Sequence, residues 1–250
     1  MRIDLNSDLG EGYGPWAMGD DAAMLDVVTS ANVACGGHAS DPETMHRTLG
    51  LARARGVKVG AHPGYADREG FGRRIIPMDP AAIASMVAAQ VGALQGVASL
   101  AGVEVAYVKP HGALANLAAD DAEVARAIAG VARAMALPVL AISGTALELA
   151  CRRAEVRVFP EVFADRTYLP NGRLVPRSRE GAVIHDAEEA VERMLAFLRT
   201  QEMPCLEGGS VRLEAASICV HSDTAGAVAM AQALRRRLMA EGVVVAPFLG

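Results

Sequence analysis

The chain has 250 residues, a formal net charge of −5 and 52% hydrophobic residues, so it can bury a sizeable α/β core. Its negative charge gives no reason to expect nucleic acid or an anionic membrane as a partner. The four cysteines lack zinc-like spacing, and we find neither a leader nor an apolar run long enough to span a bilayer. We therefore expect a cytoplasmic protein with buried, inert thiols, and the sequence leaves a homo-oligomer open.

Short apolar, β-prone runs alternate with longer helical patterns along the whole chain, without a linker or a change of composition. In the first half of the chain we expect strands at 2–6, 32–35, 57–61 and 104–108, with helices between them at about 20–29, from 41–43 and at about 79–100. A helix at about 120–135 follows, and then strands at 138–142 and 156–161 and a small hairpin or lid at 169–177. The last elements are a helix near 187–200, a strand at 216–220, a helix at 224–241, and an eighth strand or closing tail at 243–248. This order predicts an α/β fold, a single irregular TIM-like (β/α) barrel of seven or eight mostly parallel strands over residues 1–250.

The parity of side chains along the strands supports a barrel. Successive residues of a strand point to opposite faces, so Asp4 and Asn6 would lie opposite Ile3 and Leu5. One face of each strand would then pack against helices, while the other would line a polar barrel mouth. A doubly wound open sheet is the weaker alternative, because both of its faces would normally be apolar at these positions.

Six polar clusters recur along the chain, and five of them lie where an apolar run ends. They span residues 4–12, 32–41, 60–65, 108–114, 160–166 and 219–223. Four of the six histidines lie in these clusters, namely His38, His62, His111 and His221. Parallel α/β folds place catalytic groups at the carboxyl ends of their strands, so we expect one polar site built from many strands. This layout indicates an enzyme.

The first cluster places several carboxylates directly after a strand, where they could bind metal, polarise water or act as a general base. A turn with capped backbone amides is the alternative. Asp8, His38 and His62 together would form an open site for a divalent metal, although hydrogen-bonded histidines without metal are equally consistent.

Lys109 is one of only two lysines, and its motif contains no phosphate-binding loop. It could hold a carboxylate or phosphate as a point charge, and His111 could move protons at neutral pH. Arg73 lies on a glycine-rich loop and suits anion recognition, although an exposed basic loop is the simpler interpretation. The adjacent His221, Ser222 and Asp223 cannot face one another as a triad, so we interpret His221 as one member of the site.

The motifs DLNSDLGEG, NVACGGHASDP, GAHPGYADREGFGRR, VKPHGALAN, EVFADRTYLPNGRLVPR and ICVHSD together resemble the LamB/YcsF family over nearly the full chain. Ser7, Gly37, Ser40 and Ser222 depart from the residues common in that family. The resemblance implies a barrel akin to metal-dependent carbohydrate deacetylases. It also implies cleavage of 5-oxo-L-proline to L-glutamate, with ATP as co-substrate and with B and C partner subunits.

With that chemistry in view, we expect Asp8 to orient or deprotonate the attacking water, held by His38 and His62 directly or through a metal. Lys109 would neutralise charge on the activated carbonyl or its phosphate, and His111 would protonate the departing nitrogen. The residues expected to bind substrate are Asn6, Glu11, Asn32, Arg73, Glu161, Asp165, Arg166 and His221. Instead of binding substrate, Glu161 or Asp165 could form an ion pair with Arg166 that orders the lid. The alternative functions are a metal-dependent deacetylase of N-acetyl sugars and a non-catalytic lactam- or carbohydrate-binding subunit.

Overall fold

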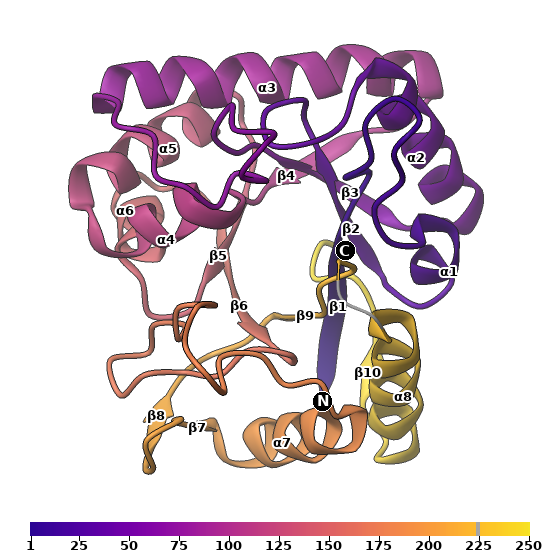
Figure 1. Ribbon diagram of the computed structural model, residues 1–250, viewed down its shortest axis with the longest axis vertical. Helices are drawn as coiled ribbons and strands as arrows, with labels where there is room; N and C mark the ends of the chain where they lie inside the picture. Colours follow the sequence, from indigo (N-terminus) through magenta and orange to yellow (C-terminus); the bar gives the residue numbers. More distant parts are fainter. Residues whose placement is uncertain (224–225) are drawn as a thin grey trace.

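A closed barrel of parallel strands forms the centre of the molecule (Figure 1). The computed structural model describes residues 1–223 and 226–250, and among these residues seven strands form the closed ring. In pairing order they are β1 (Arg2–Leu9), β2 (Ser30–Ala34), β3 (Lys58–His62), β4 (Val105–Val108), β5 (Val139–Ile142), β6 (Val158–Phe163) and β9 (Ser217–Cys219). Strand β1 pairs with both β2 and β9, which closes the ring and confirms the predicted barrel.

Helices surround the barrel on its outer side (Figure 1). They are α1 (Asp21–Leu25), α2 (Pro42–Arg55), α3 (Pro80–Ala101), α4 (Gly112–Asp120), α5 (Ala122–Ala134), α6 (Ala146–Arg153), α7 (Ala187–Thr200) and α8 (Ala227–Ala240). The short strands β7 (Glu202–Pro204) and β8 (Ser210–Arg212) form an antiparallel hairpin. Strand β10 (Val244–Val245) pairs with the start of β1, outside the closed ring.

Several expected boundaries differ from the structure. The helix expected at about 120–135 is α5, which is capped at its start by Asp121 and follows α4 directly. Helices α4 and α6 and the β7–β8 hairpin were not predicted, since their short segments carry too little periodicity. The helix at about 20–29 is only the short α1. The helix expected from 224 begins at Ala227, and residues 224–225 lie outside the described residues.

Helix α3 is long and apolar enough to cross a membrane by length and composition alone. The expectation that no apolar run could do so was therefore wrong. The helix contacts α2, α5, β3 and β4, and it buries one face that includes Ile83, Val87, Val91 and Leu94. This buried face packs against the barrel and the neighbouring helices, as in a core helix of a globular protein.

Helix α2 begins with a side-chain cap that also ties down the loop after β1. Asp41 accepts hydrogen bonds from the backbone N–H groups of Glu43 and Thr44, at 2.9 and 3.0 Å, and from that of Gly14 at 2.7 Å. The bond from Gly14 and then the bond from Thr44 lower the pKa of Asp41 to about 2. Proline at the first turn adds a fixed φ suited to a helix start.

We expect Asp41→Ala to lower the free energy of unfolding by about 1–2 kcal/mol at neutral pH, because three N–H groups lose their acceptor. Because the pKa of Asp41 is lower in the folded protein, the carboxylate stabilises the fold at pH values above its ordinary pKa of 3.8. That stabilisation is lost as the pH falls through about 2. Urea unfolding at a series of pH values should therefore show the two proteins converging at acid pH. Equal stability at neutral pH would contradict the assigned role of this cap.

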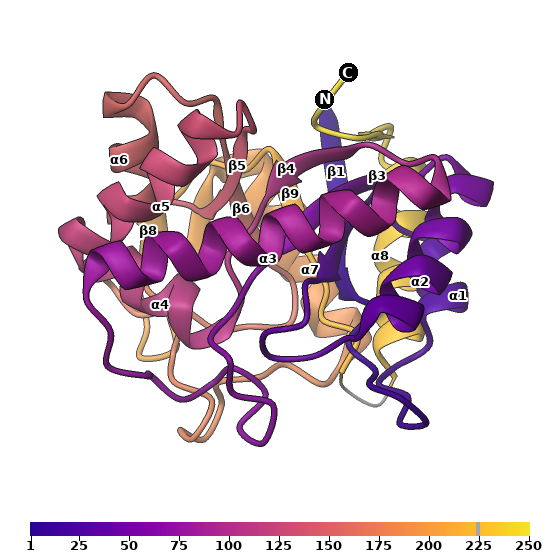
Figure 2. The same cartoon turned by 90° about the horizontal axis from the view of Figure 1, so that it is seen from above.

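The long loops that follow the strands extend from the same side of the barrel. Figure 2 shows the loops after β1, β3 and β6, coloured indigo, purple and orange, projecting together away from the helices. All seven strands run in parallel, so their carboxyl ends meet beneath these loops. The fold therefore gathers the polar clusters of the sequence at one mouth.

Candidate functional site

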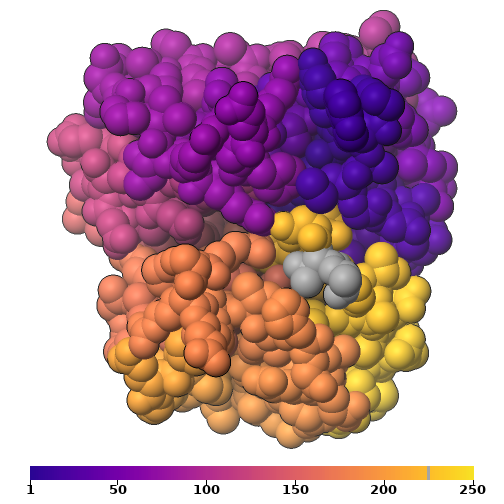
Figure 3. All heavy atoms as spheres, viewed as in Figure 1, coloured from indigo at the N-terminus to yellow at the C-terminus, as the bar shows by residue number. Residues whose placement is uncertain are grey.

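A cavity of about 460 Å³ lies at the carboxyl ends of the strands. In the space-filling view it is the hollow between the purple and orange parts of the surface (Figure 3). Eight of the residues predicted for the site line it: Asp8, His62, Arg73, Lys109, His111, Glu161, Arg166 and His221. Glu11, His38 and Asp165 lie behind this lining and contact it.

Lys109 is anchored in the floor of the cavity by two carboxylates. Its Nζ lies 3.0 Å from Asp8 Oδ1 and 3.1 Å from Glu161 Oε2, and it also donates to Asn6 Oδ1 and Cys219 Sγ. Burial alone would lower the pKa of Lys109, but the neighbouring acids, Asp8 foremost, raise it well above its ordinary value. All three N–H donors thus have partners, so this lysine is a fixed cation within a network.

The two asparagines predicted to bind substrate lie beneath the cavity instead. Asn32 Nδ2 donates to Asn6 Oδ1 and to Asp8 Oδ1, both at 2.8 Å, and its own Oδ1 accepts from the hydroxyl of Tyr107. Both asparagines are fully buried and neither lines the cavity. They orient Asp8 and Lys109, so a substrate-binding role for them does not fit this geometry.

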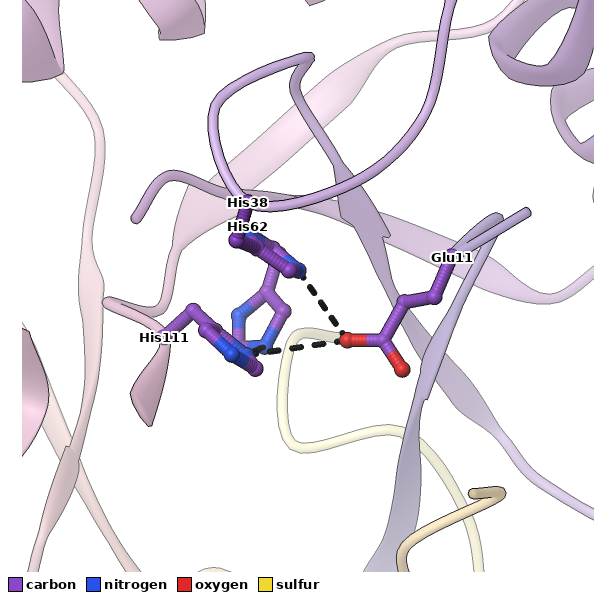
Figure 4. A group of neighbouring side chains, drawn as sticks. All are labelled: Glu11, His38, His62 and His111. Atoms are coloured by element: carbon purple, nitrogen blue, oxygen red, sulfur yellow. Dashed lines mark hydrogen bonds and ion pairs between the residues drawn. The ribbon is translucent and has the colours of Figure 1, made fainter. Parts of the chain in front are cut away.

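Three histidines and Glu11 converge beside the floor (Figure 4). The rings of His38 and His111 are stacked, with centroids 3.6 Å apart, and His62 stands edge-on to both. Glu11 Oε1 lies 3.0 Å from His38 Nε2 and 3.6 Å from His111 Nδ1. The stack passes close to Gly72, which has φ +63° and where a Cβ would lie 2.6 Å from His38 Cβ. Only glycine fits there.

The hydrogen bonds of His62 and His111 leave one nitrogen of each ring facing the other. His62 Nδ1 lies 2.7 Å from the carbonyl oxygen of Lys109, and His111 Nε2 lies 2.8 Å from that of Phe71. A carbonyl only accepts, so both of these nitrogens carry protons. The remaining contact, His111 Nδ1 to His62 Nε2 at 3.0 Å, needs either a third proton or a cation. Because both ring nitrogens of His111 are engaged, its predicted role as proton donor to the substrate does not fit.

The electrostatics of this group suit a divalent cation. Burial, and then the charge of Asp8, raise the pKa of Glu11 to about 8. Burial also lowers the pKa values of His38 and His111 well below 6.5. A cation would keep the carboxylate ionised and the histidines neutral, and the carbonyls behind His62 and His111 fix their tautomers as partners of metal ligands commonly do.

The donor atoms of Glu11, His38, His62 and His111 all lie within 4.8 Å of one another. Three imidazoles and a carboxylate are a donor set that zinc and similar metals accept. The ligands predicted from the sequence were Asp8, His38 and His62. In the structure Glu11 and His111 join the two histidines, whereas Asp8 stands beside the group, with Oδ2 3.3 Å from His62 Nε2.

The segment predicted to form a hairpin or lid makes one wall of the cavity. Tyr168 and Leu174 form an antiparallel bridge, and residues 173–178 line the cavity. Arg166 holds the segment from below, donating to the carbonyl oxygens of Ala182 and Val175. Four arginines face the cavity, namely Arg73, Arg166, Arg173 and Arg177. Arg73 and Arg177 pair with Asp223, and Arg173 pairs with Asp120, so an anionic ligand would share these arginines with acids.

His221 and Asp165 form a pair at the edge of the cavity. His221 Nδ1 lies 2.8 Å from Asp165 Oδ2 and 3.0 Å from Oδ1, and its ring stacks on Phe163. The other two histidines, His46 and His185, are exposed, as the sequence indicated.

Comparison with known proteins identifies the family. The sequence model of the LamB/YcsF family matches residues 3–250. The chain belongs to the LamB/YcsF family. It is 48% identical to the A subunit of a 5-oxoprolinase from Rhodopseudomonas palustris and 52% identical to that of Nocardia farcinica, each alignment covering 100% of both chains. The crystal structure of a lactam utilization protein from Thermus thermophilus is similar, with a TM-score of 0.92, 42% identity and coverage of 98% of this chain and 99% of that one. These likenesses favour neither the deacetylase nor the non-catalytic binding protein.

Two residues of the sequence motifs have close structural surroundings. Ser40 has φ 75°, a left-handed conformation that favours glycine. At Gly37, a Cβ would lie 2.5 Å from Gln90 Oε1 and 2.6 Å from the carbonyl oxygen of Gly64. The missing side chain leaves room for Gln90 to hold Gly64 by two hydrogen bonds.

Proposed function

We propose that this chain is the A subunit of a cytoplasmic, ATP-dependent 5-oxoprolinase that acts with B and C subunits. In this reaction 5-oxo-L-proline is cleaved to L-glutamate at the expense of ATP. The observation that carries the proposal is the cavity itself, which combines a floor of carboxylates, lysine and histidines with a wall of four arginines. The names of the full-length relatives support the same reaction.

The residues of the cavity match the needs of lactam opening. An unreactive cyclic amide requires a positioned water, an activated carbonyl and a proton for the leaving nitrogen. Burial raises the pKa of Asp8, but the charges of His62 and Lys109 outweigh it and hold that pKa well below 3.8. Asp8 therefore stays ionised and orients the water by accepting its hydrogen bonds. The arginine wall binds the carboxylate of the substrate and the phosphate that ATP supplies for activation.

We propose a divalent metal held by Glu11, His38, His62 and His111. When bound, such a metal lowers the pKa of a ligated water and polarises a carbonyl.

Glu11→Gln keeps the shape of the side chain and removes its charge, so we expect the bound metal to fall from about one equivalent to a small fraction. The affinity should weaken roughly 10–100-fold or more, as when groups that support a metal site are removed. Elemental analysis of the purified proteins and titration calorimetry with zinc or manganese would measure both. Glu69→Gln is the matched control, because the Glu69 side chain is exposed on a loop of the same face. Equal metal content in all three proteins would refute the assigned site.

The reaction is tested by ATP-dependent formation of glutamate from 5-oxoproline, with this chain and its B and C partners present together. The chain contains no recognisable nucleotide-binding motif. The proposal therefore assigns it the ring-opening site and makes turnover depend on the complete assembly.

A further inference from the structure

Asp165 and His221 lie at the ends of the neighbouring strands β6 and β9. The carboxylate of Asp165 is buried and accepts from His221 Nδ1 with both oxygens, so the proton on that nitrogen is fixed. The stacked ring of Phe163, inclined by 16°, limits rotation of the imidazole. His221 lines the cavity, and its Nε2 has no hydrogen-bond partner among residues 1–223 and 226–250.

The other motif histidines have no ring nitrogen open to the cavity. His111 and His62 each use both ring nitrogens, with backbone carbonyls on one side and with each other on the other. His38 Nδ1 lacks a partner in the described part of the chain, but it is buried and His38 does not line the cavity. Of the four, His221 is the one placed to exchange a proton with a bound substrate.

We propose that His221, held by Asp165, is the acid that protonates the ring nitrogen as the lactam opens, an inference that rests on the proposed function. The water oxygen bonds to the carbonyl carbon, whose oxygen carries the phosphoryl group from ATP, and the carbon–nitrogen bond breaks with its electron pair passing to nitrogen. The proton on Nε2 of the His221 imidazolium moves to that nitrogen, which becomes the amino group of glutamate. The proton lost by the water returns to Nε2 and restores the imidazolium. A second water then hydrolyses the acyl phosphate to the carboxylate of glutamate and free phosphate.

Asp165 is a positioning residue in this scheme. Burial would raise its pKa, but the charge and hydrogen bond of His221, and then Arg177 and Arg166, hold that pKa below its usual range. Asp165 therefore stays ionised, and its two hydrogen bonds keep the proton on Nδ1 and leave Nε2 of His221 to act in the cavity. An orienting carboxylate of this kind sets both the tautomer and the direction of the ring.

The test uses the reconstituted complex of this chain with its B and C partners. We expect His221→Ala to lower kcat for glutamate formation about 10²–10⁴-fold, the usual contribution of a general acid, with KM for 5-oxoproline changed far less. Added imidazole should restore part of the lost rate. Asp165→Asn keeps the shape of the side chain but disturbs the tautomer, so we expect a loss of about a hundredfold or more without rescue by imidazole. His185→Ala, an exposed histidine in the segment after β6, is the control and should match the wild type.

A wild-type complex that forms no glutamate would refute the proposed function itself. If the wild type is active, the inference about His221 fails on either of two results: a kcat of His221→Ala close to that of the wild type, or a loss that imidazole does not restore. Circular dichroism and thermal unfolding of each variant check the fold. A lowered melting temperature with no rescue would assign the pair a purely structural role.

Discussion

Lys109→Met is expected to reduce glutamate formation by the reconstituted enzyme a hundredfold or more, on the order of 3 kcal/mol in the activation barrier. Methionine keeps most of the stem and removes only the charge. Asp8 and Glu161 would then share a buried floor without their cation, at 3.0 and 3.1 Å from the missing ammonium group. One of the carboxylates would take up a proton, and the water would lose its oriented acceptor.

The same change should lower the free energy of unfolding by about 3–5 kcal/mol, because breaking a buried ion pair leaves an uncompensated charge. The variant Lys109→Met with Glu161→Gln removes one of the two unpaired acids, so it should regain part of that stability and none of the activity. His46→Ala changes an exposed histidine and should be silent in both measurements. Comparable activity losses in Lys109→Met and His46→Ala, or recovery of turnover with the double variant, would contradict the assigned role of the lysine.

The alternation of side chains along the strands predicted part of the site from the sequence. Asp4, Asn6 and Asp8 alternate along β1 and all contact other strands of the barrel, as the alternation indicated. The pattern ends at Gly10, whose φ of +66° turns the chain. Glu11 therefore joins the histidines, and nothing in the alternation could place it there. A glycine at a strand end followed by an acid was the only available signal.

Parity also could not separate residues that face a substrate from residues that face one another. Asp4 lies at the closed end of the barrel, where it bonds to Thr29, Ser30 and Ser217. Burial raises the pKa of Asp4, and those hydrogen bonds only partly oppose it. Asn6 lies in the layer above it, below the cavity floor. The depth of a side chain within a barrel depends on strand stagger, which a single sequence does not display.

The pairing of Asp165 with His221 depends on which strands are neighbours. The two residues are 56 positions apart, and they meet because β6 pairs with β9 while the intervening segment forms the cavity wall, α7 and the β7–β8 hairpin. The sequence indicated that both belonged to the site. It could not show that one holds the other, because the excursion between them obscures the order of the strands.

The most direct test of the central claim is a glutamate assay of the purified chain, with and without its B and C partners. The sequence has no recognisable nucleotide-binding motif, and the proposed function assigns this chain the ring-opening cavity and makes activation of the lactam depend on its partners. We expect little or no glutamate from the chain alone or from the partners alone. With all three subunits, 5-oxoproline and ATP, glutamate and phosphate should form together. Full ATP-dependent turnover by the single chain, or an equal rate from the partners without it, would contradict the account.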